Sequence, residues 1–175
     1  MKNGIATQNN VFNVFDTDAN EKLKGVVTVQ LPALGLMTNT FKGAGVGGEI
    51  NVPVPGVMSA QTATISFPKG YGPLARLFAL AKTGTLTLYN DVVLTHETHA
   101  LGHIQDKWVL KGPVTKYDPG KIEQAATSDG SIEMQVYYAH HWLDGEDILE
   151  WDVFNRIFTV NGEDLLADIR QNIMD

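Results

Sequence analysis

The stretch from Ser131 to Val160, SIEMQVYYAHHWLDGEDILEWDVFNRIFTV, determines how the rest of the chain can be arranged. Its apolar side chains fall on even positions in the first limb and on odd positions in the second, which is the period of strands with one buried face. The two sets are Ile132, Met134, Val136, Tyr138 and Trp142, then Leu149, Trp151, Val153 and Ile157. Between them lies Asp144-Gly145, a dipeptide that tolerates the positive φ angles of a type I′ turn. The stretch therefore predicts one hairpin with a two-residue loop.

The pairing of the two limbs follows from that loop. A two-residue loop sets Tyr138 opposite Trp151 and Ile132 opposite Ile157, so apolar side chains meet apolar ones. A loop one residue longer would place acidic side chains against the apolar row. Each limb is roughly 12 residues, or ~40 Å at ~3.3 Å per residue, about twice the usual strand length. Strands of that length need a large body to lie against.

Composition limits the class of protein. A chain of 175 residues predicts a single domain spanning residues 1–175. The absence of cysteine excludes a disulfide scaffold and thiolate metal sites. No apolar run approaches the ~18 residues of a membrane span, so we expect no membrane anchor and synthesis in a cytoplasm. The net charge of −7 disfavours a protein that grips nucleic-acid phosphates.

Working outward from the hairpin, the pattern predicts further strands and two helices. Alternating residues favour strands over 27–31, 61–67, 85–94 and 101–115. Pro73 predicts the start of a central α-helix, and acidic residues predict a short C-terminal helix over 163–174. The glycine- and proline-rich residues 41–55 predict an extended loop whose role is contact. The fold class expected is mainly β, an antiparallel β-sandwich or barrel with these two helices.

Two motifs resemble chemical sites, but their contexts are wrong. Gly43 to Gly48 contains GxGxxG, yet the two prolines that follow prevent the helix that would hold a pyrophosphate. His96, His99 and His103 lie in HETHALGH, whose spacing differs from the HExxH of a zinc protease helix. Cysteine nucleophiles, GxSxG elbows and Walker loops are absent from the sequence. We expect no enzyme, no cofactor and no metal site.

Four segments, in order along most of the chain, resemble the major tail tube proteins of contractile-tailed bacteriophages, the P2-like tube family that R-type bacteriocins also use. They are VFNVFDTDANEKLKGVVTVQLPAL, FKGAGVGGEINVPV, KGPVTKYDPGKIEQ and QVYYAHHWLDGEDILEWDVFNRIFTVNGEDLLADIRQNI. Residues 89–107, which include the HETHALGH histidines, match the family poorly.

The resemblance implies a structural protein of a virion tail or phage-tail-like particle that is synthesised in the cytoplasm of a bacterial host. Its subunits are expected to form hexameric rings that stack into a tube, with strands of every subunit joined in one barrel around the lumen. The implied partners are further copies of the chain, the tail sheath, the baseplate or tube initiator and the tape measure protein. Phage DNA is expected to pass through the lumen without specific binding, or the tube to be driven through an envelope.

Two surfaces follow as hypotheses. The acidic side chains on the polar face of the hairpin would line the lumen, although the same face could equally be the solvated outside; they are Glu133, Glu150 and Asp152. The loop would mediate contact between rings through Phe41, Gly43, Gly45, Val46, Gly47, Gly48 and Ile50. The alternative function is a monomeric β-barrel that binds a small ligand in its interior, and an enzyme on the same barrel is a more distant third.

Overall fold

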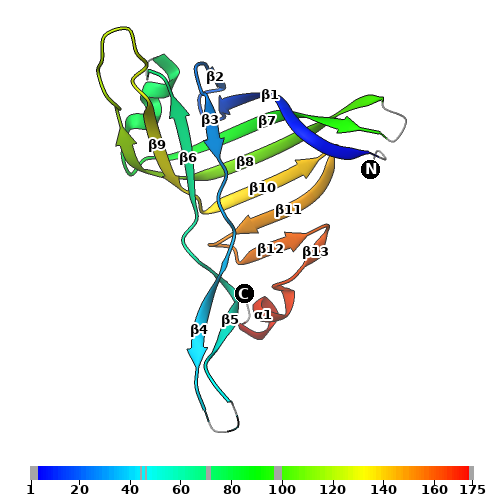
Figure 1. Cartoon of the computed structure of the whole chain (residues 1–175). Helices are drawn as coiled ribbons and strands as arrows, with labels where there is room; N and C mark the ends of the chain where they lie inside the picture. The colour runs from blue at the N-terminus through cyan, green and yellow to red at the C-terminus, as the bar shows by residue number, and fades with distance from the viewer. Residues whose placement is uncertain (1–3, 44, 46, 70–71, 97–99, 174–175) are drawn as a thin grey trace.

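The chain folds mainly into antiparallel β-strands, as the alternating sequence predicts (Figure 1). This computed structural model describes residues 4–43, 45, 47–69, 72–96 and 100–173. The elements are β1 (Ile5–Asp16), β2 (Glu21–Leu23), β3 (Thr28–Gln30), β4 (Leu36–Phe41), β5 (Ile50–Met58), β6 (Thr62–Phe67), the 3₁₀-helix η1 (Gly72–Phe78), β7 (Thr83–Thr95), β8 (Leu101–Asp118), β9 (Gly130–Gln135), β10 (Tyr138–Leu143), β11 (Glu146–Asp152), β12 (Ile157–Val160), β13 (Glu163–Asp164) and α1 (Ala167–Ile173). The expected mainly β class with a short C-terminal helix is confirmed.

The strands form two layers that share the long strand β8. The main layer has the order β13-β12-β11-β10-β8-β7-β1-β2, and the second layer consists of β3, β6 and β9. Up to Pro113, β8 pairs with β7, and from Val114 to Asp118 it pairs with β9. Gly112 lies at this transition, where a Cβ atom would be 1.8 Å from the carbonyl oxygen of Gln135. The absence of a side chain at Gly112 therefore permits the crossing between layers.

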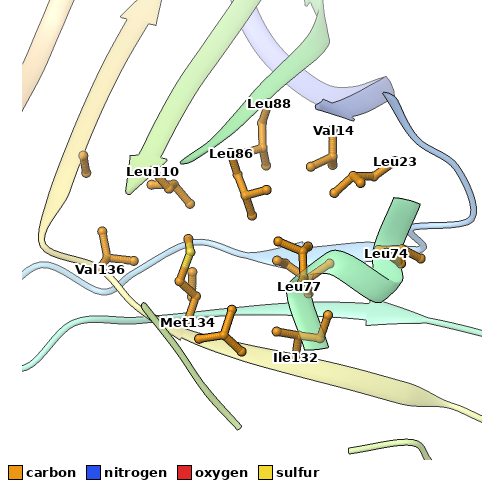
Figure 2. Close-up of a cluster of buried hydrophobic side chains, with 14 of the residues drawn as sticks. Val14, Leu23, Leu74, Leu77, Leu86, Leu88, Leu110, Ile132, Met134 and Val136 are labelled. Carbon is orange, nitrogen blue, oxygen red and sulfur yellow. The ribbon is translucent and has the colours of Figure 1, made fainter. Parts of the chain in front are cut away.

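The core fills the space between the layers. Leu86 and Leu110 of the main layer and Ile132 and Met134 of the second layer are buried there (Figure 2). Trp151 of the main layer is buried in the same cluster. Each such side chain contributes roughly 1.5–3 kcal/mol through its removal from water. Within the described residues the strands do not close into a barrel. The described residues therefore do not form the closed barrel interior in which the alternative function would bind a small ligand.

The turn predicted at Asp144-Gly145 is confirmed. Both residues have positive φ, 52° and 82°, and Leu143 pairs with Glu146 across the loop. The prediction of a single long hairpin is wrong, however, because the first limb is divided into β9 and β10. Ile132 pairs with Ile65 of β6 and not with Ile157. The first limb therefore contributes one half to each layer.

The break between β9 and β10 also reverses which side chains point inward. In β9 the even residues Ile132 and Met134 are buried, whereas in β10 the buried residue is Ala139. A register shift between His141 and Trp142 then places Ala139, and not Tyr138, opposite Trp151. The small Ala139 side chain leaves room in the core for the Trp151 indole.

Both helices differ from prediction. The central α-helix is instead the 3₁₀-helix η1, whose Leu74 and Leu77 pack on the core. The C-terminal helix begins at Ala167 and not at Glu163, because Leu165 donates its backbone N–H to the carbonyl of Phe158 at 2.9 Å and keeps that segment extended. None of the helices in the described ranges is long and apolar enough to cross a membrane.

The predicted loop 41–55 is instead part of a β-hairpin. Strands β4 and β5 pair only with each other and project away from both layers (Figure 1). Pro53 lies opposite Thr38 in this hairpin, and proline is tolerated because β5 has an open edge. We call residues 36–58 the arm.

Candidate functional site: assembly surfaces

The arm exposes apolar side chains on a hairpin that has no core of its own. Every residue of β4 is exposed, and Phe41, Ile50 and Val52 have 51%, 46% and 43% of their surface accessible. A two-stranded hairpin is at best marginally stable alone in water. An apolar hairpin of this kind is typical of a surface that becomes covered by a partner.

The predicted inter-ring residues gather at the tip of the arm. Phe41 pairs with Ile50, and Lys42 forms a 2.7 Å ion pair with Glu49. The Phe41 ring lies over Gly43, where a Cβ atom would be 2.9 Å from its Cζ. Gly45 has a φ of 87°, and a Cβ atom on Gly47 or Gly48 would have no neighbour within 4 Å. Val46 lies outside the described residues.

The base of the arm is anchored to the body by the C-terminal helix. Gly56 has a φ of 79°, and a Cβ atom there would lie 3.2 Å from Ile169 and 3.4 Å from Leu166. Ser59 also donates its backbone N–H and its hydroxyl to the carbonyl of Gly35, at 2.8 and 2.9 Å. The body therefore sets the direction in which the arm projects.

A second candidate surface is the side of the main layer that faces away from the core, which we call the outer face. Tyr89, Lys107, Trp142 and Asp147 are in register across β7, β8, β10 and β11. The Lys107 ammonium lies 4.4 Å from the Trp142 ring centroid, and the His140 ring stacks on Trp142 at 3.6 Å. Trp142 was expected on the core face, but the reversed parity of β10 places it here.

Glu150 lies on the outer face beside this row. Its carboxylate accepts a 3.2 Å hydrogen bond from the Tyr138 hydroxyl. Burial, together with the negative charge of Glu150, raises the pKa of Tyr138 to about 12. His140 lies 2.8 Å from the Asp147 carboxylate, and Lys107 and Lys111 occupy the same face. The outer face is therefore of mixed charge and not uniformly acidic.

Asp152 shares this face with Glu150 but is engaged in a turn. Its carboxylate accepts the backbone N–H groups of Phe154 and Asn155, both at 2.9 Å, and the Asn155 side-chain amide at 2.7 Å. This turn carries the chain from β11 to β12. Val153, expected in the core beside Trp151, lies in the turn and is 44% exposed.

Glu133 is separated from the other two acids. It lies between the buried residues Ile132 and Met134 of β9, so its side chain points away from the core on the second layer. Its carboxylate accepts a 2.8 Å hydrogen bond from Lys116, an interaction that raises the pKa of Lys116. The structure thus brings Glu150 and Asp152 together and places Glu133 on the opposite side of the two-layer body.

A third surface is a groove that the sequence does not reveal. It has a volume of about 360 Å³ and lies between β3 and the inner side of β1, β7 and β8. Its apolar lining includes Phe12, Val29, Leu88 and Trp108. Asn90 donates from its side-chain amide to Asn9 and Asp106, but its Oδ1 atom is buried and has no hydrogen-bond partner among the described residues. No local motif could have predicted this groove, because four distant segments form it.

The motifs that resemble chemical sites are dispersed. His96 donates its backbone N–H to the carbonyl of Ala100 at 3.0 Å. His103 on β8 lies 2.9 Å from the carboxylate of Asp91 on β7, and His99 lies outside the described residues. Within the described ranges, no group of three or more His, Asp or Glu side chains is placed to hold a metal ion. The glycine stretch is followed by β5 and not by a helix, as the prolines predict.

Comparisons with known proteins point to one family. The family model described as phage tail tube protein FII matches residues 8–173 of the chain. The tail tube protein of Escherichia phage P2 is 26% identical over 148 residues, which cover 83% of this chain and 85% of that protein. The expected P2-like tail tube relationship is therefore confirmed. The chain belongs to the phage tail tube protein FII family, a family of structural tail proteins and not of enzymes.

Proposed function

We propose that this protein forms hexameric rings that stack into the inner tube of a contractile tail, in a phage or a phage-tail-like bacteriocin. The tube is the conduit for DNA or for penetration of an envelope, and it contacts sheath, baseplate or tube initiator, and tape measure proteins. The observation that carries the proposal is the arm, an apolar hairpin without a core on a chain of the tail tube family. Stacked copies would cover it.

The edge of the main layer supports the joining of subunits into rings. Strand β2 pairs with β1 only from Val14 to Asp16, so the edge of β1 from Ile5 to Asn13 has no strand beside it among the described elements. Ile5 and Val11 on this part of β1 are 72% and 64% exposed. An open edge with apolar side chains favours pairing with another chain, and closure of a ring satisfies every such edge.

The role of the arm in stacking can be tested at its tip. We expect that deletion of residues 43–48, or the double change Phe41→Ser and Ile50→Ser, gives folded subunits that no longer polymerise. Leu80→Ser is the matched control, because Leu80 is 59% exposed but lies outside the arm. Negative-stain electron microscopy is the measurement. Tubes of normal length from both arm variants would show that the arm is not the stacking contact.

We further infer that the outer face, with Glu150 and Asp152, lines the lumen. Carboxylates on a channel wall repel DNA phosphates, so the DNA slides without binding. The mixed charge of the face is compatible with this role, because Lys107 and His140 are engaged with aromatic and acidic neighbours. Since six subunits share one lumen in the proposed ring, a single charge change is repeated around the channel.

The lumen assignment can be tested by reversing one charge on each layer. Glu150→Lys should leave rings intact and impair DNA ejection, whereas Glu133→Lys on the second layer should not. Asp152 is left unchanged because its carboxylate holds the turn at 153–156. The measurement is the amount of DNA that assembled particles release on ejection. Impairment by Glu133→Lys alone would place the second layer at the lumen, and normal ejection in both variants would reject an electrostatic role for these acids.

A further inference from the structure

The arm and the groove are complementary surfaces at different ends of the same molecule. We propose that the arm of one copy docks in the groove of a second copy and adds a strand to the open edge of β3. This inference rests on the proposed stacking function and identifies the receptor surface for the arm. The occupant of the groove is a second copy of this chain.

In the isolated subunit the groove has an exposed apolar lining and one buried polar atom without a hydrogen bond among the described residues. Its lining is largely apolar, and Val27 on its rim is 56% exposed. The Oδ1 atom of Asn90 is a buried acceptor that finds no donor among the described residues. A buried polar atom without a hydrogen bond is costly, so a donor from an incoming segment would stabilise the groove. The segment that fits is apolar and supplies a hydrogen-bond donor to Asn90 Oδ1.

The open edge of β3 supplies the complementary backbone. Residues Thr28 to Gln30 pair with β6 on one side, and among the described strands none pairs with β3 on the other. Val27, Thr28 and Val29 line the groove along this strand. The arm has open edges too, since β4 and β5 pair only with each other. Addition of an arm strand to β3 would satisfy both edges, while Phe41, Ile50 or Val52 cover the apolar lining.

The arrangement excludes the arm of the same subunit. Figure 1 shows the arm projecting from one end of the molecule, while β1, β3, β7 and β8 lie toward the other. Gly56 and its contacts with Leu166 and Ile169 hold the base of the arm in that direction. The contact is therefore between copies, head to tail. A head-to-tail contact whose rotation does not close a ring generates an open stack, which is the symmetry that a tube requires.

Engineered cysteines test the docking directly, because the chain has no native cysteine. A subunit carrying Val27→Cys in the groove is mixed with one carrying Ile50→Cys on the arm, assembled and oxidised. We expect covalent dimers from the mixture and a ladder of multimers from the double variant. The matched control pairs Ile50→Cys with Ile122→Cys, which is 90% exposed and distant from the groove in sequence. Cross-linking no greater than in this control would overturn the proposal.

Hydrogen exchange of the unmodified protein provides a second test that needs no variant to fold. On passing from free subunit to tube, amides of residues 28–30 and of the arm should become protected together. Tubes in which the arm is protected but residues 28–30 exchange as in the free subunit would overturn the docking while leaving stacking intact. Failure of the unmodified protein to form tubes would instead reject the stacking function, and this inference with it.

Discussion

Trp151 shows how one residue can be buried without satisfying all of its groups. Its side chain is 1% exposed in the core, and its indole N–H is buried without an acceptor among the described residues. Trp151 therefore stabilises the fold through apolar contact, and its indole N–H contributes no hydrogen bond.

Because only the apolar contacts of Trp151 stabilise the fold, we expect two substitutions at this position to lower the free energy of unfolding by different amounts. Trp151→Ala should destabilise the subunit by about 3–5 kcal/mol because it leaves a large cavity. Trp151→Phe should cost less than half of that, because it keeps most of the apolar volume and removes the unpaired N–H. Urea unfolding of the free subunit measures both. Equal losses in the two variants would mean that the indole N–H has a partner that stabilises the fold.

Gly112 is required by a close approach of two backbones. A Cβ atom there would lie 1.8 Å from the Gln135 carbonyl oxygen and 3.3 Å from the Val136 Cα. Because both neighbours are backbone atoms, they cannot move aside without separating β8 from the break between β9 and β10. We expect Gly112→Ala to destabilise the subunit by about 3 kcal/mol or more, or to prevent folding.

Gly48→Ala is the matched control for this prediction, since no atom lies within 4 Å of its added Cβ. It should change the free energy of unfolding by less than about 0.5 kcal/mol. Urea unfolding or, for a variant that does not fold, the yield of soluble protein is the readout. A Gly112→Ala protein as stable as Gly48→Ala would contradict the close crossing of the layers.

At the scale of elements, an ion pair joins β13 to the C-terminal helix. The Asp164 carboxylate accepts hydrogen bonds from Arg170 and from the backbone N–H of Leu166. These two interactions, the Arg170 bond first, lower the pKa of Asp164 below its usual value of 3.8. A lowered pKa in the folded state means that the ionised carboxylate stabilises the fold, and that protonation removes this contribution.

The expected result is a stability difference that depends on pH. The difference in free energy of unfolding between the unmodified protein and the Asp164→Asn variant should be constant above about pH 5. This difference should decrease as the pH falls below about 4. Urea unfolding from pH 3 to pH 7 measures it. In an Arg170→Met background the Asp164→Asn change should have a much smaller effect. A gap that persists unchanged at pH 3 would show that Asp164 acts through packing.

For the whole molecule, the arm should contribute little to the stability of the free subunit. The described residues between 38 and 53 are all exposed, so replacement of this segment by a short turn removes no core contact seen in the structure. We expect the free energy of unfolding to change by less than about 1 kcal/mol while assembly is lost. Urea unfolding and negative-stain microscopy of the same sample test this. A large loss of stability would mean that the arm is part of the subunit's own fold.

Several features could be predicted from the sequence because they depend on local rules. Asp144-Gly145 specifies its own turn through the φ angles that the two residues tolerate. Alternation in 61–67, 85–94 and 101–115 specifies strands, because successive side chains point to opposite faces. The order of the four family motifs likewise needed no structure, and it predicted the tail tube relationship.

Other features depend on which strands become neighbours. The alternation of residues 132–142 is equally satisfied by one long strand or by β9 and β10 in different layers, and only the packing of Ala139 beneath Trp151 and of Ile132 beside Ile65 separates them. For the same reason Glu133 is separated from Glu150, and residues from four segments meet in the groove. The sequence by itself determined the turn, the strand-rich class and the family, because these follow from local backbone preference and motif order. Only the tertiary structure decided the break at Val136, the projecting arm and the groove, because partner choice depends on contacts between residues far apart in the chain.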